Sequence, residues 1–156
     1  MGDVNRRALF TRQGKYQARV AGAVIASRAP HSSTADVEAV PGVVFTDPEV
    51  ASVGLTVREA ERTGRDVEVA DYEIGHLAGA VQYRPDYRGR ARNLIDRDRQ
   101  VVVGATFVGP GVAELLYSAT VAITGEVPVE RLWHAVPAFP TISEVWLRLL
   151  EARRDS

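Results

Sequence analysis

The sequence predicts an α+β domain in which helices pack on one face of an antiparallel sheet. Strand-like segments with alternating apolar residues dominate residues 41–108, and helical apolar spacings dominate after residue 111. A short polar segment also separates two of the strands, as in a hairpin. Strands that precede a group of helices are typical of an α+β layer rather than of alternating β and α units. The length of 156 residues fits one compact domain with an appendage.

The N-terminal part reads as an appendage to the domain. Apolar residues at helical spacings predict a loop followed by a helix over residues 11–27. Residues 28–40 mix proline, serine and charged residues without apolar periodicity, so they read as a linker. We therefore expect a boundary between residues 1–40 and a main domain formed by residues 41–156.

The main domain is predicted to begin with short extended segments. Residues 43–45 and 50–53 read as strands, separated by a turn at Asp47 and Pro48. Because Thr56 is followed three residues later by Glu59, the chain has a capping-box pattern. A helix is therefore expected over residues 57–63, and Gly64 should end it.

The central part of the chain predicts the clearest strand pairing. Alternating apolar residues indicate a strand over residues 67–74, and residues 79–83 read as extended. Residues 91–95 and 101–108 flank the polar segment Asp96 to Gln100, whose length fits a hairpin loop. We expect these two strands to pair antiparallel.

The last part predicts three helices. One apolar stripe, ended by Gly125, contains Leu115, Leu116, Ala119, Ala122 and Ile123. Pro128 suits the first turn of a short helix through Trp133. Thr141 can cap a last helix, whose apolar residues are Val145, Trp146, Leu149 and Leu150. The two tryptophans suit a monomer core and a subunit interface equally well.

Composition excludes several classes of function. The formal net charge is -1, and the arginines are interleaved with acidic residues, so the basic stripe needed for nucleic acid is missing. No apolar run approaches the roughly 20 residues of a membrane span. The absence of cysteine excludes disulfides, a thiolate nucleophile and the usual structural zinc sites within this chain. No secretory signal is visible, so we expect a cytoplasmic protein.

The residue types of other active sites occur without their usual context. The glycines near residues 104–111 lack the G-x-G-x-x-G spacing and fit a strand and its turn better than a phosphate cradle. His134, Ser143 and Glu144 could compose a hydrolase triad, but Ser143 has no nucleophile elbow and reads as a first-turn helix residue. His31, His76 and His134 are too scattered to predict a metal site.

Several segments occur together in the order of a known domain. They are residues 43–56, Glu59-Ala60, residues 103–105, residues 108–110 and the closing Pro140-Thr141-x-x-Glu144. In this combination the chain resembles the C-terminal dimerisation domain of the FAD-dependent pyridine nucleotide-disulfide oxidoreductases, the family of dihydrolipoamide dehydrogenase and mercuric reductase. The resemblance covers roughly residues 41–151 and implies an antiparallel sheet with helices on one face, and a homodimer.

The N-terminal segment resembles the end of the FAD domain in the same family. By this resemblance Asp3 would bind the ribityl and phosphate region of FAD, and Leu9 and Phe10 would lie near the flavin ring. Residues 1–40 would then be the tail of an FAD domain plus a linker. The glycine motifs for FAD and NAD(P)H and the redox cysteines are missing from the chain. We therefore expect the C-terminal third of a larger enzyme, which binds no cofactor by itself and is inactive alone.

The resemblance departs from the family at the catalytic position. The family pairs a histidine with a glutamate over the flavin and disulfide of the other subunit, and its histidine position is Phe139 here. Glu144 occupies the carboxylate position, and Pro140 follows where the family tends to have a cis peptide bond. A phenyl ring cannot carry a proton, so dithiol acid-base chemistry should be lost. His134, five residues before Phe139, is a possible substitute base.

The function that follows is hydride transfer from NAD(P)H through FAD to a non-disulfide acceptor, such as a quinone, a dye-like compound or another nicotinamide. Phe139 would form an apolar wall near the flavin. The principal alternative is a stand-alone dimerising or ligand-binding module without redox activity, which uses the same sheet as a scaffold. A hydrolase that uses Ser143 is a more distant alternative. The sequence does not select the acceptor or distinguish NADH from NADPH.

Overall fold

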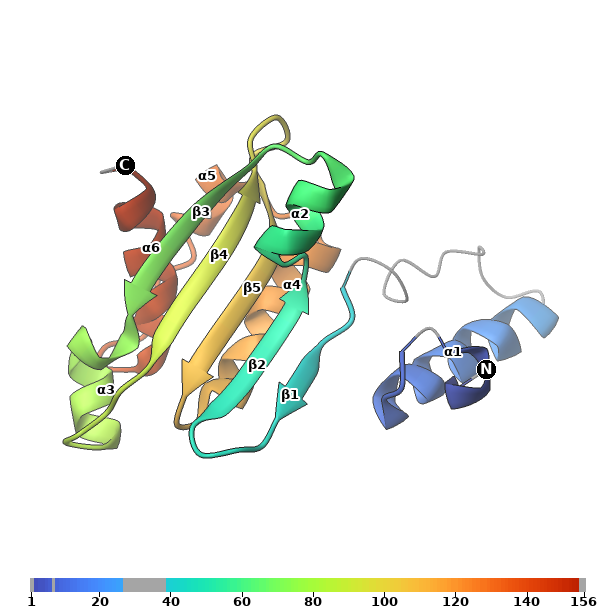
Figure 1. Cartoon of the computed structure of the whole chain (residues 1–156), viewed down its shortest axis with the longest axis horizontal. Coiled ribbons are helices and arrows are strands. Elements are labelled where there is room, and N and C mark those ends of the chain that lie inside the picture. Colours follow the sequence, from blue (N-terminus) through green and yellow to red (C-terminus); the bar gives the residue numbers. More distant parts are fainter. Residues whose placement is uncertain (1, 7, 27–38, 155–156) are drawn as a thin grey trace.

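The main body of the protein is an antiparallel sheet of five strands in the order β1-β2-β5-β4-β3 (Figure 1). The computed structural model describes residues 2–6, 8–26 and 39–154. The strands are β1 (Gly42–Val44), β2 (Glu49–Gly54), β3 (Val67–Glu73), β4 (Arg90–Asp96) and β5 (Val101–Gly109). The predicted α+β class is confirmed, and so is the predicted hairpin, because β4 pairs antiparallel with β5.

Two helices of the main body pack on one face of this sheet. In the described part of the chain the α-helices are α1 (Thr11–Ile25), α2 (Val57–Thr63), α3 (Ala78–Tyr83), α4 (Leu116–Thr124), α5 (Val129–Leu132) and α6 (Val145–Arg154). Helix α4 contacts β5 and β2, and α6 contacts β3 and β4. Figure 1 shows α4 behind the sheet and the short α2 in front of it. The two faces of the sheet are therefore covered unequally.

Alternation along the strands places the main core under α4 and α6. Phe107 is fully buried there, and its ring meets Trp146 edge to face at a centroid distance of 6.0 Å. A register shift between Leu94 and Ile95 interrupts the pairing of β4 with β5. Because a bulge changes the alternation of side chains, Val102 and Ala105 both belong to the main core although they lie three positions apart.

Helix α2 is bounded by the signals that predicted it. The Thr56 hydroxyl accepts a hydrogen bond from the backbone N–H of Glu59, and the Glu59 carboxylate accepts one from the backbone N–H of Thr56. The bond from the Thr56 N–H, together with one from the Thr56 hydroxyl, holds the pKa of the Glu59 carboxyl below its ordinary value. Gly64 ends the helix in the left-handed conformation at φ 67°. Ala60 packs on Leu94, Val101 and Val103, which form a second, smaller core on this face.

The end of β2 approaches β5 more closely than a side chain would allow. A Cβ atom at Gly104 would lie 2.0 Å from the backbone oxygen of Leu55. Gly54, paired with Gly104, has a φ of +76°, and a Cβ there would lie 2.3 Å from the Val103 oxygen. The Leu55 N–H donates to the same Val103 oxygen at 2.8 Å. Glycine at both positions is thus required where β2 turns toward α2.

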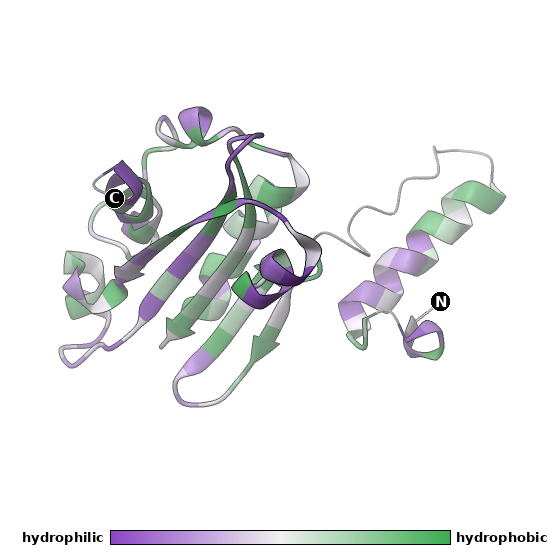
Figure 2. Cartoon of the chain, turned by 45° about the horizontal axis from the view of Figure 1, so that its top comes forward, coloured by the Kyte–Doolittle hydropathy of each residue, from purple (hydrophilic) through white to green (hydrophobic). Residues whose placement is uncertain are grey.

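The N-terminal segment forms its own small unit. A 3₁₀ helix, Gly2–Asn5, lies against α1, where the Gln17 side-chain oxygen accepts hydrogen bonds from the Gly2 N–H and the Asn5 amide. Helix α1 changes from hydrophilic in its first half to hydrophobic in its second half (Figure 2). Helix α1 is described to Ile25, and the predicted linker falls largely outside the described residues. The predicted boundary at residue 40 stays a prediction.

Three local predictions were wrong. Residues 79–83 are helical rather than extended, because α3 packs its backbone at Gly79 against Thr141, a contact between distant segments. The predicted strand end at Ile74 is a 3₁₀ helix, Ile74–His76, whose first N–H bonds to the Gly89 oxygen. The predicted Thr141 side-chain cap is absent, because its hydroxyl donates instead to the Ala138 carbonyl at 2.6 Å.

The close approach at Gly104 predicts a large effect of a small substitution. Gly104→Ala should lower the free energy of unfolding by about 2–4 kcal/mol, because its Cβ would meet backbone that cannot rotate away. Gly22→Ala in α1 is the control, because no atom lies within 4 Å of the added carbon. Urea unfolding followed by circular dichroism measures both variants. Equal stabilities of Gly104→Ala and the wild type would contradict this account of the β2–β5 contact.

Candidate functional site

The loop between α5 and α6 contains the residues predicted for the site. This loop passes from His134 to Thr141 and enters α6 through a 3₁₀ turn, Ile142–Glu144. The Phe139–Pro140 peptide bond is cis, as the family resemblance led us to expect. The Phe139 ring is 74% exposed, so it projects away from the core. Residue 139 thus presents an apolar ring at the surface, where it cannot exchange a proton.

Helix α3 holds the loop from the other side. A Cβ atom at Gly79 would lie 2.2 Å from the Thr141 carbonyl carbon, so the two backbones are in direct contact. The Thr141 hydroxyl closes the turn by its bond to Ala138, and the Glu144 N–H donates to the Thr141 oxygen at 3.3 Å. The loop conformation is therefore set by backbone contacts on both sides of Pro140.

Glu144 is buried and paired within its own helix. Its residue exposure is 7%, and its Oε1 atom accepts hydrogen bonds from Nε and Nη2 of Arg148 at 3.1 and 2.7 Å. The Nη1 atom of Arg148 donates to Glu151 at 2.8 Å. These bonds, first to Glu151 and then to Glu144, raise the pKa of the Arg148 guanidinium. Arg148 thus shares its one positive charge between Glu144 and Glu151.

One oxygen of this carboxylate remains available. Oε2 of Glu144 is buried and has no hydrogen-bond partner among residues 2–6, 8–26 and 39–154. A buried carboxylate oxygen without a donor is costly, so it favours the approach of a donor group. His134 does not fill this role here, because it is exposed in the turn after α5 and its backbone N–H bonds to Arg131.

The structure gives no support to a triad or a metal site. Within the described residues, the Ser143 hydroxyl makes no hydrogen bond to a histidine, and no group of His, Asp and Glu side chains could hold a metal ion. Ser143 lies in the first turn before α6, as predicted. His76 meets the Tyr72 ring edge to face, and His31 lies outside the described residues.

An apolar cavity of about 440 Å³ lies beside the loop. It is open to solvent and bordered by α4, the segment after α5 and the start of α6. Its lining residues are Ser118, Val121, Ala122, Val127, Leu132, Ala135, Pro137, Ser143 and Trp146. The Trp146 indole N–H donates to the Ser118 hydroxyl at 3.0 Å, which holds the ring beside the cavity. Exposed Tyr117, Val136 and Phe139 add to the apolar side chains presented by these same segments.

The residues predicted to contact flavin lie elsewhere. Asp3 is exposed in the first 3₁₀ helix, and Leu9 and Phe10 are exposed just before α1. The Phe10 ring lies against the backbone of Gly42 at the start of β1. Figures 1 and 2 both place α1 on the opposite side of the sheet from α6. The chain therefore does not bring Asp3, Leu9 and Phe10 together with the Phe139 loop, and their flavin role stays a prediction.

No helix in the described part of the chain is long and apolar enough to span a membrane. Four exposed apolar residues, Tyr117, Val121, Val136 and Phe139, lie on α4 and on the loop before α6. The sheet, the helices on one face and this loop together define an α+β domain with an apolar surface beside the loop.

Comparisons with known proteins identify the family. A family model described as pyridine nucleotide-disulphide oxidoreductase, dimerisation domain, matches residues 40–150. The chain belongs to this family. It is 35% identical to dihydrolipoyl dehydrogenase of Chlamydia trachomatis and 32% identical to that of Chlamydia muridarum, in each case over 94% of this chain and 30% of the relative. The chain thus spans about a third of the length of these relatives.

A solved structure shows the same fold. The HOCl-induced flavoprotein disulfide reductase RclA from Escherichia coli matches with a TM-score of 0.83 and 24% identity, over 97% of this chain and 34% of that chain. This likeness supports the α+β class independently of the sequence motifs.

Sequence reasoning missed two residues that shape the site. Arg148 stands four residues after Glu144, a spacing that brings side chains together on one helix face. This signal was present in the sequence and would have predicted the ion pair. Ser118 could not have been found in this way, because it lies 28 residues from Trp146 and their contact depends on the packing of α4 against α6.

The buried ion pair predicts unequal effects of its members. Arg148→Met should lower the free energy of unfolding by about 2–4 kcal/mol, because it leaves the buried Glu144 carboxylate without a counter-ion. The double variant Glu144→Met/Arg148→Met should be more stable than Arg148→Met alone, because no buried charge remains. Chemical denaturation of both variants checks this, with Glu151→Gln as a control for the more exposed partner. A double variant less stable than Arg148→Met would contradict the prediction.

Proposed function

We propose that this chain is the dimerisation domain of an FAD-dependent NAD(P)H oxidoreductase and that it contacts the electron acceptor. This acceptor is not a disulfide. The observation that carries the proposal is the exposed Phe139 ring at the position where the family places its histidine. A dithiol must lose and regain protons during exchange, and a phenyl ring provides no group for this. The cofactors FAD and NAD(P)H and a cytoplasmic location belong to the same proposal.

A second copy of the chain is the partner that the apolar surface of α4 fits best. Tyr117 and Val121 lie one helical turn apart on α4, and both are at least half exposed. The apolar cavity opens beside them, with Trp146 held at its side. Exposed aromatic residues next to an apolar cavity are typical of interface centres. A second copy of the chain, pairing through the same surface, would bury these residues symmetrically.

An apolar electron acceptor is favoured over a disulfide. The unpaired Oε2 atom of Glu144 could accept a hydrogen bond, but the Phe139 side chain has no N–H to donate to it. Arg148 already pairs with this carboxylate, so Glu144 has little capacity to stabilise a protonated partner. An apolar ring at residue 139 would instead contact a planar acceptor, such as a quinone, through stacking or edge-to-face packing. The proposal of a non-disulfide acceptor therefore depends on one position, where Phe139 stands in place of the family's histidine.

The dimer is tested with matched valine variants. The wild-type chain should sediment as a dimer, and Val121→Asp should raise its dissociation constant at least about tenfold, because a charge would be buried in an apolar interface. Val44→Asp is the control, since Val44 is similarly exposed but lies on the edge strand β1. Analytical ultracentrifugation measures both. A monomeric wild type, or dissociation by Val44→Asp alone, would contradict the proposed interface.

The acceptor is tested in the complete flavoenzyme that the proposal implies. Quinone reduction by NAD(P)H should exceed reduction of lipoamide or glutathione disulfide by a factor of about 10² or more, since a positioned acid-base group contributes roughly that much. Phe139→His should raise disulfide reduction and leave quinone reduction within about threefold. Rapid disulfide turnover in the wild type that is lost in His134→Ala would overturn the proposal and identify His134 as the base.

A further inference from the structure

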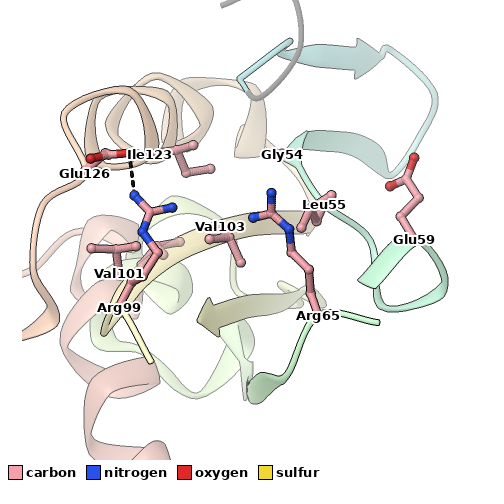
Figure 3. A pocket seen from close by; sticks show the side chains of 10 residues that line it. Gly54, Leu55, Glu59, Arg65, Arg99, Val101, Val103, Ile123 and Glu126 are labelled. Carbon is pink, nitrogen blue, oxygen red and sulfur yellow. Dashed lines mark hydrogen bonds and ion pairs between the residues drawn. The ribbon is translucent and has the colours of Figure 1, made fainter. Parts of the chain in front are cut away.

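A second cavity, unrelated to the proposed function, lies at the end of the sheet far from Phe139. It is formed where β2 ends, β5 begins and α4 ends, and its volume is about 200 Å³ (Figure 3). Its lining comes from α2, the β4–β5 hairpin and α4 as well as from the two strands, so several elements fix its shape. The nearby Gly54–Gly104 contact holds the strands at this end together.

The floor of the cavity is apolar and its rim is charged. Val101, Val103 and Ile123 line the floor, and each is more than nine-tenths buried. The rim carries two guanidinium groups, of Arg65 just after α2 and of Arg99 in the hairpin. Figure 3 shows the two guanidinium groups on either side of Val103, with Arg99 to its left and Arg65 to its right. An apolar floor beneath a rim that offers a guanidinium group suits a ligand that is itself amphipathic.

The two arginines differ in their partners. Arg99 forms an ion pair with Glu126, which Figure 3 marks with a dashed line. The Arg65 guanidinium has no carboxylate partner among the residues that the structure describes. Glu59, the other acid of the lining, is engaged by Thr56, whose backbone N–H and hydroxyl donate to it at 2.9 and 2.8 Å. A cation without a counter-ion therefore stands at the mouth of an apolar cavity.

We propose that this cavity binds a small organic monocarboxylate. The carboxylate accepts hydrogen bonds from Arg65 beside Arg99, since a guanidinium fork matches a carboxylate in geometry and charge. The apolar body of the ligand lies on Val101, Val103 and Ile123. A volume of about 200 Å³ is below the usual range for drug-sized ligands, so a single ring or a chain of about six carbons fits.

The charges of the rim select against other anions. Glu59 and Glu126 both lie at the cavity, so a second negative charge on the ligand would be repelled. Inorganic phosphate would match the guanidinium groups but leave the apolar floor uncovered. Acetate carries the right charge but has too little body to cover the same floor. Affinity should thus require both one carboxylate and an apolar group.

The proposal is tested by titrating the whole chain with benzoate, acetate and inorganic phosphate, followed by two-dimensional NMR of the backbone amides. Benzoate should produce saturable shifts at Val103 and Ile123, and acetate and phosphate should bind at least about tenfold more weakly. Arg65→Gln should weaken benzoate binding at least about tenfold. Arg62→Gln is the matched control, because Arg62 lies in the last turn of the same helix and outside the cavity lining.

Arg99→Gln provides a second test that does not depend on the folding of the Arg65 variant, and it should also weaken benzoate binding. An unchanged affinity in Arg65→Gln would overturn the proposal. Equal binding of benzoate and phosphate would also overturn it, because it would show a response to charge alone. The absence of any saturable shift at about 20 mM benzoate would have the same consequence. A loss of binding in Arg62→Gln as large as that in Arg65→Gln would also overturn it.

Discussion

The burial of β5 on both faces is the constraint on which the rest of this structure depends. β5 lies at the centre of the sheet, and its first five residues, 101–105, are all buried. The main core under α4 and α6 covers one face of it, and the small core under α2 covers the other at one end. β2 and β4 pair with β5 on either side, and β1 and β3 extend the sheet from these two strands.

The position of the α5–α6 loop follows from that packing through α6. At its start α6 is fixed by the Glu144–Arg148 pair, and at its end Arg153 donates to Glu68 of β3 at 2.8 Å. The Arg154 guanidinium lies 4.3 Å from the centre of the Trp133 ring, which joins the end of α6 to the end of α5. The loop is thus bounded by two elements that are themselves attached to the sheet.

Local signals in the sequence were sufficient for some of this fold and not for the rest. Helix α2 could be predicted because its boundaries depend on Thr56, Glu59 and Gly64, all within nine residues of one another. The hairpin of β4 and β5 is also local. Helix α3 could not be predicted, because its conformation depends on contact with Thr141, which lies far along the chain. Likewise, nothing local shows that β2 pairs with β5, or that Arg65 and Arg99 meet at one cavity.

The shape of the loop does not depend on the side chain at position 139. The shape of the loop comes from Pro140, the Thr141 contact with α3 and the turn into Glu144, and none of these interactions needs a titratable group at residue 139. The Glu144 carboxylate also has a structural reason to be present, because its ion pair with Arg148 compensates its burial. A loop held in this way keeps its geometry whichever side chain residue 139 presents. The contacts that hold the loop are thus independent of the phenyl ring that residue 139 presents at the surface.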